Sequence, residues 1–132
     1  MKATKVILVE DDEDDKDLFE SFVGTRPDVT LLPTVGNGLE LIEYLENAAA
    51  NELPDLIVLD QNMPKMNGKQ TLQFLKSSDR FSDIATVVYS TYADSVLIAD
   101  CTKLGAVMVA SKPIDQVGYQ KMMDEFMTVF QE

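Results

Sequence analysis

Short runs of consecutive apolar residues alternate along this chain with segments whose apolar residues recur at helical spacing. Each run is too short for a helix and too continuous for a strand with one solvent face, so it indicates a strand buried on both faces. Strands that alternate with helices predict a mostly parallel sheet covered by helices. The predicted strands are residues 6–9, 29–32, 56–59, 85–89 and 106–110. We therefore predict an α/β fold, a three-layer sandwich around a five-stranded parallel sheet.

The helices predicted between and after these strands are amphipathic, with apolar residues three or four positions apart. The first is expected to start at Asp14. Asp94 and Asp115 are candidate N-caps of later helices, and Gly105 is a candidate C-terminal stop. Pro33, beside the second strand, indicates a sheet edge, where a missing amide donor costs least. The residues expected on the buried helix faces are Leu18, Phe19, Phe22, Val23, Leu39, Ile42, Leu45, Leu72, Leu75, Leu97, Cys101, Leu104, Met122, Phe126 and Phe130.

Composition excludes several classes of function. With 23 acidic and 11 basic residues, the net charge of −12 argues against binding to nucleic acid, whose phosphates would be repelled. The absence of histidine removes the commonest general base and transition-metal ligand, and with them the Ser-His-Asp constellation. A single cysteine, Cys101, excludes an internal disulfide and suits a reducing compartment. No apolar run approaches the roughly 20 residues that cross a bilayer. We expect a cytoplasmic protein that binds neither nucleic acid nor membrane.

Polar side chains follow four of the predicted strands at the point where each strand ends. Glu10 and Asp11 follow the first strand, Asp60 the third, Ser90 the fourth and Lys112 the fifth. The carboxyl ends of parallel strands meet at one edge of the sheet, where open α/β sheets bind their ligands, so these side chains are expected to converge.

Such a cluster has a definite chemistry. Three carboxylates would repel one another, and a hard divalent cation such as Mg²⁺, which prefers oxygen ligands, would relieve that repulsion. Lys112 adds a positive charge and Ser90 a hydroxyl donor. Metal, ammonium and hydroxyl around one carboxylate are what phosphoryl transfer to that carboxylate needs. We interpret Asp60 as a reactive nucleophile.

The segment from Glu10 to Asp17 carries seven acids in eight positions. Glu13, Asp14, Asp15 and Asp17 are interpreted as a solvated helix start, where acids suit the helix dipole. A calcium-binding EF-hand loop is excluded, because its sixth position would be Lys16 and its twelfth Phe22.

Four motifs together resemble the receiver domain of the response regulators of two-component signalling. They are Val-Glu-Asp-Asp at 9–12, Leu-Asp-Gln-Asn-Met-Pro-Lys-Met-Asn-Gly at 59–68, Tyr-Ser-Thr at 89–91 and Ser-Lys-Pro at 111–113. Each motif alone is weak, but their order and spacing are specific. The resemblance implies a flavodoxin-like strand order 2-1-3-4-5 and a single receiver domain over residues 1–132, similar to the chemotaxis regulators, with no attached output domain.

The resemblance also implies roles for individual residues. Asp60 would accept a phosphoryl group from a histidine kinase or a histidine phosphotransfer protein, and Ser90 and Lys112 would hold phosphoryl oxygens. Mg²⁺ would be bound by Asp11, Asp60 and the backbone carbonyl of Asn62, with Glu10 acting largely through water. The peptide bond between Lys112 and Pro113 is expected to be cis.

Two positions depart from the family pattern. Val109 stands where many relatives have an aromatic residue that moves inward on phosphorylation, which puts that form of coupling in doubt. Tyr92 occupies a position that flanks, with Asn62, the path of the water that hydrolyses the phosphoaspartate, and we predict that its bulk slows hydrolysis.

Several functions remain open from the sequence. The first is a signalling switch, not an enzyme, that binds a downstream protein through the face of the fourth helix, fifth strand and fifth helix, as a monomer or a phosphorylation-dependent dimer. A phosphorelay shuttle is equally allowed. A phosphohydrolase of the haloacid dehalogenase type is disfavoured, because its second aspartate is here Asn62. A phosphorylation-independent binding module is a further alternative, and an FMN-binding flavodoxin is a poor one.

Overall fold

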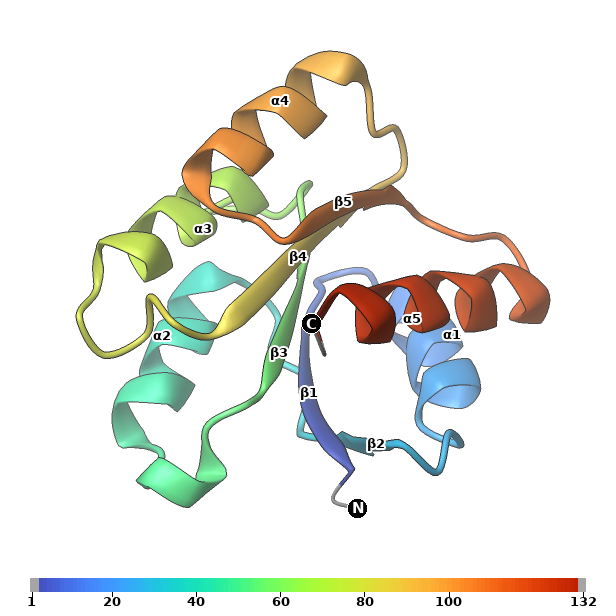
Figure 1. The fold of residues 1–132 in the computed structure, drawn as a ribbon, viewed down its shortest axis with the longest axis horizontal. Coiled ribbons are helices and arrows are strands. Elements are labelled where there is room, and N and C mark those ends of the chain that lie inside the picture. Colours follow the sequence, from blue (N-terminus) through green and yellow to red (C-terminus); the bar gives the residue numbers. More distant parts are fainter. Residues whose placement is uncertain (1–2, 131–132) are drawn as a thin grey trace.

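A computed structural model describes residues 3–130, and the side chains of residues 3–128. Its centre is one parallel sheet in the order β2-β1-β3-β4-β5 (Figure 1). The strands are β1 (Thr4–Val9), β2 (Val29–Leu31), β3 (Leu56–Asp60), β4 (Ala85–Ser90) and β5 (Met108–Ser111). The helices are α1 (Glu13–Val23), α2 (Gly38–Asn47), α3 (Gly68–Ser77), α4 (Ser95–Leu104) and α5 (Gln116–Phe130), with a 3₁₀ turn η1 (Ala50–Glu52) before β3. The predicted three-layer α/β fold and its strand order are confirmed.

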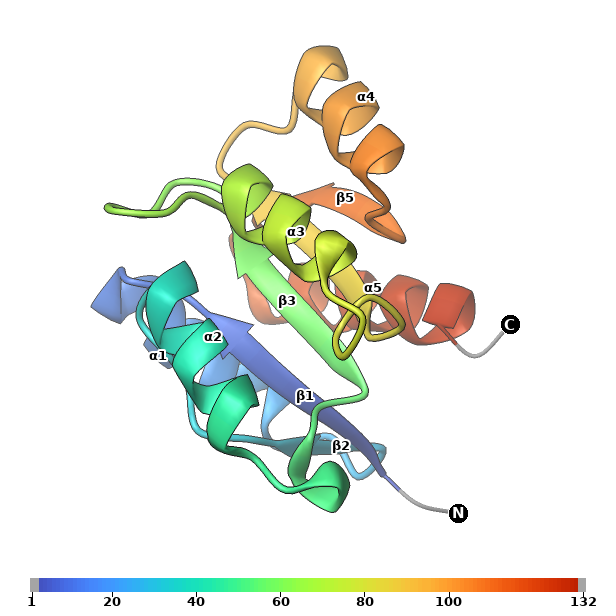
Figure 2. The same cartoon turned by 90° about the vertical axis from the view of Figure 1, so that its left-hand side faces the viewer.

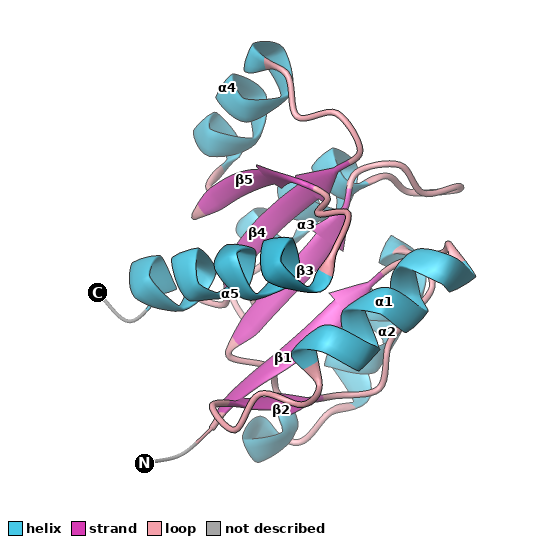
Figure 3. Cartoon of the chain, turned by 90° about the vertical axis from the view of Figure 1, so that its right-hand side faces the viewer, coloured by secondary structure: helices cyan, strands magenta, loops and turns pink. Residues whose placement is uncertain are grey.

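The helices form two outer layers, each with its own hydrophobic core. Helices α1 and α5 cover one face of the sheet (Figure 3), while α2, α3 and α4 cover the other (Figure 2). Residues 56–59 of β3 have no exposed surface, because β3 is the middle strand and is covered on both sides. Alternate residues of each strand face opposite layers: Leu56 and Val58 pack with α1 and α5, and Ile57 and Leu59 with the other helices.

Two helices differ from the sequence prediction, α1 in its first residue and α2 in its buried face. The first starts at Glu13 rather than Asp14, because the side chain of Asp12 caps it by accepting a hydrogen bond from the amide of Asp15 (3.0 Å). In α2 the predicted face was partly wrong. Leu39 is 53% exposed, and the buried stripe consists of Leu41 and Leu45, one turn apart.

The ends of α4 and α5 follow their local sequence. Asp94 caps α4 by accepting a hydrogen bond from the amide of Leu97 (2.8 Å), and Gly105 ends it with φ 108°. Asp115 accepts a hydrogen bond from the amide of Gly118 (2.8 Å) at the start of α5. Of the apolar stripe predicted on α5, Met122 and Phe126 are buried. The side chain of Phe130 lies outside the described part of the structure.

The expected cis bond before Pro113 is wrong, since the described residues contain no cis peptide bond. The amide of Lys112 donates to the carbonyl of Ser90 (2.8 Å) and so continues the pairing of β5 with β4 past its last residue. This bond holds the backbone of Lys112 at the sheet edge. Among the described helices, none combines the length and the hydrophobicity that crossing a membrane requires.

Gly68 begins α3 directly against the end of β3. A Cβ added there would lie 2.7 Å from the carbonyl oxygen of Asp60 and 2.9 Å from Cα of Gln61, both backbone atoms that cannot swing away. At Gly36, by contrast, an added Cβ would meet only the carboxylate of Glu40, at 3.3 Å.

We predict that Gly68→Ala destabilises the protein by about 1–3 kcal/mol, because the helix must shift away from the strand end. Gly36→Ala is the matched control and should change stability much less, because the carboxylate of Glu40 is the end of a flexible side chain. Urea denaturation of the two variants beside the wild type measures the difference. Equal stability of Gly68→Ala and wild type would contradict the close approach.

Candidate functional site

The side chains expected at the strand ends do converge on one edge of the sheet. Glu10 and Asp11 follow the last residue of β1, Asp60 is the last residue of β3, Ser90 is the last residue of β4, and Lys112 follows the last residue of β5. Because the four strands are parallel and in register, these positions lie side by side.

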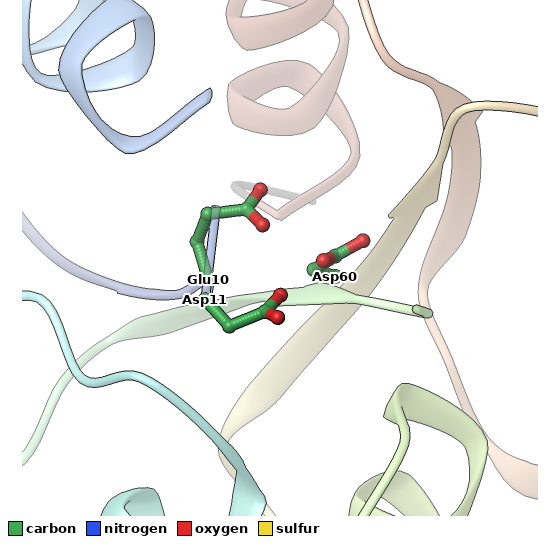
Figure 4. Close-up of side chains that lie close together, drawn as sticks. All are labelled: Glu10, Asp11 and Asp60. Carbon is green, nitrogen blue, oxygen red and sulfur yellow. The ribbon is translucent and has the colours of Figure 1, made fainter. Parts of the chain in front are cut away.

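Three carboxylates form an acidic cluster at this edge. One oxygen from each of Glu10, Asp11 and Asp60 can be chosen so that all lie within 4.8 Å of one another. The carboxylates of Glu10 and Asp11 extend from the end of β1 toward Asp60 (Figure 4). Glu10 and Asp60 are 2% and 1% exposed, whereas Asp11 faces solvent. Such hard oxygen donors, open to solvent on one side, have the chemistry of a Mg²⁺ or Mn²⁺ site.

Lys112 lies within ion-pair distance of two carboxylates of the acidic cluster and of a third carboxylate, Asp15, outside it. Its Nζ is 3.1 Å from Oδ1 of Asp60, 3.2 Å from Oε1 of Glu10 and 2.8 Å from Oδ2 of Asp15. Burial lowers the pKa of the Lys112 ammonium, but the hydrogen bond to Asp15 and the charges of Asp60 and Glu10 outweigh it, so the pKa is raised. Lys112 therefore stays charged at neutral pH.

The pKa of Asp60 is raised from 3.8 to about 7. Burial is the largest cause, followed by the hydrogen bond and negative charge of Glu10, while Lys112 acts in the opposite direction. Asp60 is thus a carboxylate whose charge is poorly compensated by its protein neighbours. A second cation beside it would favour the ionised, nucleophilic form.

The loops after β3 and β4 meet above Asp60. The amide of Asn62 donates to Oδ1 of Asp60 (3.2 Å), and its side-chain Nδ2 donates to Oγ of Ser90 (3.5 Å). The amide of Tyr92 also donates to Oγ of Ser90 (3.4 Å), and the Tyr92 side chain is 75% exposed. Val109 lies in β5 and packs with the layer of α2, α3 and α4, away from Lys112.

Two contacts at the site were not predicted from the sequence. Asp15 was interpreted as part of a solvated helix start. Its carboxylate instead forms an ion pair with Lys112 across the sheet edge. Tyr89, interpreted as part of an apolar strand, donates its hydroxyl to Oε1 of Glu10 (2.6 Å). Nothing in the sequence distinguishes Asp15 from the acidic residues beside it. Alternation by two residues gives a signal for Tyr89, since it continues the face on which Val87 packs with α1 and α5.

Comparison with known proteins agrees with this arrangement. Residues 6–124 match the family model of the response regulator receiver domain. The "Probable C4-dicarboxylate response regulator DctR" of Bacillus subtilis is 31% identical over 125 residues, which are 95% of this chain and 53% of DctR. A protein-glutamate methylesterase/protein-glutamine glutaminase of Treponema denticola is 32% identical over 115 residues, which are 86% of this chain and 29% of that protein. The chain therefore spans about half or less of the length of these relatives.

Solved structures give the same result. The phosphorylated cyanobacterial phytochrome response regulator RcpA has a TM-score of 0.83 and 25% identity, covering 98% of this chain and 95% of that one. The Mn²⁺-bound form of response regulator Rcp1 has a TM-score of 0.77 and 25% identity, covering 93% of this chain and 91% of that one.

A parallel sheet in the order 2-1-3-4-5 with acids and a lysine at its carboxyl edge defines a flavodoxin-like signalling domain. More narrowly, the chain belongs to the response regulator receiver domain family. The resemblance seen in the sequence is confirmed.

The raised pKa of Asp60 has a consequence for stability. Its folded-state pKa of about 7 exceeds the ordinary 3.8, so the folded protein holds a proton that the unfolded chain releases, and stability falls as pH rises through this window. Asn cannot ionise, so Asp60→Asn should escape that loss.

We predict that, with a chelator present, Asp60→Asn is more stable than wild type above pH 7, by about 1.4 kcal/mol for each unit of raised pKa. The difference should shrink as the pH falls and vanish well below pH 3.8, where Asp60 is protonated in both states. Asp79→Asn, which removes an exposed carboxylate, is the control for overall charge. Urea denaturation across the pH range measures both, and a constant difference between Asp60→Asn and wild type would contradict the prediction.

Proposed function

We propose that this chain is a two-component response regulator receiver in which Asp60 accepts a phosphoryl group from the phosphohistidine of a histidine kinase or phosphotransfer protein. The observation that carries the proposal is the convergence on Asp60 of a partly buried lysine and an acidic cluster, with Lys112 Nζ at 3.1 Å from Oδ1. The family assignment supports it, because receiver domains are signalling domains.

The residues present fit a divalent cation. Asp11, Asp60 and the backbone carbonyl of Asn62 would hold Mg²⁺, and Glu10, which lies in the same acidic cluster, would act largely through water as the family resemblance implies. When bound, the ion supplies positive charge that offsets the repulsion among the carboxylates and the incoming phosphoryl oxygens. Similarity to the Mn²⁺-bound form of Rcp1 adds support for the binding of a divalent cation.

The side chains and backbone groups around Asp60 would each have a separate role in phosphoryl transfer. A carboxylate oxygen of Asp60 attacks phosphorus as the bond to the donor nitrogen breaks, and the freed histidine keeps the electron pair. Lys112 and Ser90 would hold phosphoryl oxygens, Lys112 by exchanging part of its contact with Glu10 and Asp15 for the new charge. The amide of Asn62, which donates to Oδ1 at 3.2 Å, keeps the Asp60 carboxylate in place. Catalysis here consists of positioning and charge stabilisation.

Output would pass through a surface that binds a downstream protein in one phosphorylation state. The face of α4, β5 and α5 is supported by its exposed apolar residues Val96 and Val107, which are 65% and 38% exposed. A groove lined by Met108, Ser111 and Lys121 lies beside β5 on this face. The organisation as a single domain and the oligomeric state remain predictions, and the methylesterase activity belongs to the longer relatives named above.

A phosphohydrolase is the less well supported function. In a haloacid dehalogenase-like enzyme, a second aspartate two residues after the nucleophile acts as general acid and base. Here the position is Asn62, whose side-chain amide donates to Ser90 and, because it does not ionise near neutral pH, cannot act as a general acid or base. The arrangement favours an acceptor that is phosphorylated once over an enzyme that turns over external phosphomonoesters.

We predict that the purified chain incorporates one phosphoryl group from acetyl phosphate only when Mg²⁺ is present. Asp60→Asn should abolish incorporation, and Lys112→Met should reduce it strongly, because it removes the charge that faces the phosphoryl oxygens. Phos-tag electrophoresis or intact mass spectrometry measures the modified fraction.

Asp79→Asn and Lys103→Met, both at exposed positions, are the matched controls and should behave as wild type. Incorporation that survives Asp60→Asn would reject Asp60 as the acceptor. Sustained hydrolysis of phosphomonoesters would favour the enzyme, and partner binding unaffected by Asp60→Asn and by Mg²⁺ would favour a phosphorylation-independent module.

Tyr92 provides a further prediction. Its amide donates to Oγ of Ser90, which ties its backbone to the site, and the family resemblance implies that this position flanks the path of the attacking water. We expect Tyr92→Ala to shorten the half-life of the phosphoaspartate several-fold, and Tyr92→Phe, which keeps the bulk, to change it little. The decay of phosphorylated protein after removal of the donor measures both, and an unchanged half-life in Tyr92→Ala would reject the idea.

A further inference from the structure

Tyr89 is a tyrosine inside the sheet, directly opposite Asp60. It pairs with Asp60 in the register between β3 and β4, and its side chain has no exposed surface. The ring packs in the core of α1 and α5, edge-on to Phe19 with 6.3 Å between ring centroids. Packing in this core explains why the ring is buried but not why it carries a hydroxyl group. A buried hydroxyl without a hydrogen-bond partner destabilises the fold.

The hydroxyl is used at the site. It donates to Oε1 of Glu10 at 2.6 Å, the length of a strong hydrogen bond to a charged acceptor. The Glu10 side chain has no exposed surface, so the donors around it decide where its carboxylate lies. The others are Nζ of Lys112, 3.2 Å from the same Oε1, and the amide of Asp12, 3.2 Å from Oε2.

The ring of Tyr89 also supports Lys112. The ammonium lies 5.1 Å from the ring centroid, within the range of a cation–π contact. A single buried side chain therefore contacts both members of the Glu10–Lys112 pair, with its hydroxyl on the acid and its ring face under the base.

The two donors on Oε1 of Glu10 compete. Without the tyrosine hydroxyl, the buried oxygen would depend on Lys112 for compensation, and a buried charge that loses a donor draws the remaining one closer. Lys112 would then be held by Glu10 and be less available to Asp60 and to phosphoryl oxygens.

We propose that Tyr89 is a positioning residue for phosphoryl acceptance, whose hydroxyl satisfies Glu10 so that Lys112 remains shared with Asp60. The inference rests on the proposed function of Asp60. Tyr89 touches no reacting atom and acts through Glu10 and Lys112.

The chain offers a matched pair of variants. Tyr119 in α5 is also fully buried and edge-on to Phe19 with 6.3 Å between centroids, but within the described residues its hydroxyl has no hydrogen-bond partner. Tyr89→Phe and Tyr119→Phe each remove one buried hydroxyl and keep the ring. Only the first removes a donor to Glu10.

The experiment measures three quantities for each variant: the rate of phosphoryl acceptance from acetyl phosphate at saturating Mg²⁺, the Mg²⁺ concentration that gives half that rate, and Tm. Tyr89→Phe should lower the saturated rate about tenfold, the loss expected for one hydrogen bond to a charged group. Its half-saturating Mg²⁺ should change less, because Glu10 acts through water. Tyr119→Phe should keep the wild-type rate.

A double-mutant cycle shows whether Tyr89 acts through Glu10. In a Glu10→Gln background, Tyr89→Phe should have little further effect on the rate, since the charged acceptor is gone. Equal rates in Tyr89→Phe and wild type, or full additivity in the cycle, would overturn the inference and leave the function of Asp60 intact. Failure of the wild type to accept phosphate in an Asp60-dependent manner would instead overturn the proposed function.

Discussion

The ammonium of Lys112, shared among three carboxylates from different parts of the chain, is the interaction on which this site depends. Asp60, Glu10 and Asp15 lie 2.8 to 3.2 Å from it, on β3, after β1 and in α1. One positive charge cannot neutralise this many acids, and the pKa of Asp60 is raised first by burial and then by the hydrogen bond and negative charge of Glu10. The excess of negative charge at this edge favours binding of a divalent cation, which would also offset the charge of an added phosphoryl group.

Much of the fold and most of this site could be predicted from sequence, because both depend on local and repeating patterns. Apolar runs that end in polar residues placed Asp60 and Lys112 at one sheet edge, and the crossover rule for parallel strands required that edge to be shared. Pro33 indicated the edge strand correctly, since β2 has a neighbour on one side only. The capping residues Asp94 and Asp115 were equally local signals, and they were correct.

The features that were missed depend on long-range geometry. Asp15 differs from its acidic neighbours only because its turn of α1 faces Lys112, and sequence spacing cannot place a helix relative to a lysine 97 residues away. Leu39 and Leu41 are equally apolar, and their local spacing does not tell which of them faces the sheet, where the structure buries Leu41. The cis peptide bond before Pro113 was inferred from relatives and not from any local signal in this sequence, and it is absent from the described residues.

The pleat of the sheet divides the site between the two helical layers. Glu10, Asp60 and Tyr89 continue the faces of their strands that pack with α1 and α5, whereas Ser90 follows Val88 onto the face of α4. Phosphoryl oxygens held by both Lys112 and Ser90 would therefore join groups from opposite sides of the sheet. In this chain the buried aromatic ring at the site, Tyr89, lies on the α1 and α5 side, and Val109 supplies no ring on the other. A movement of Lys112 would first change its ion pair with Asp15 and so affect α1. A change at Ser90 would reach the α4 side through the loop that follows Ser90.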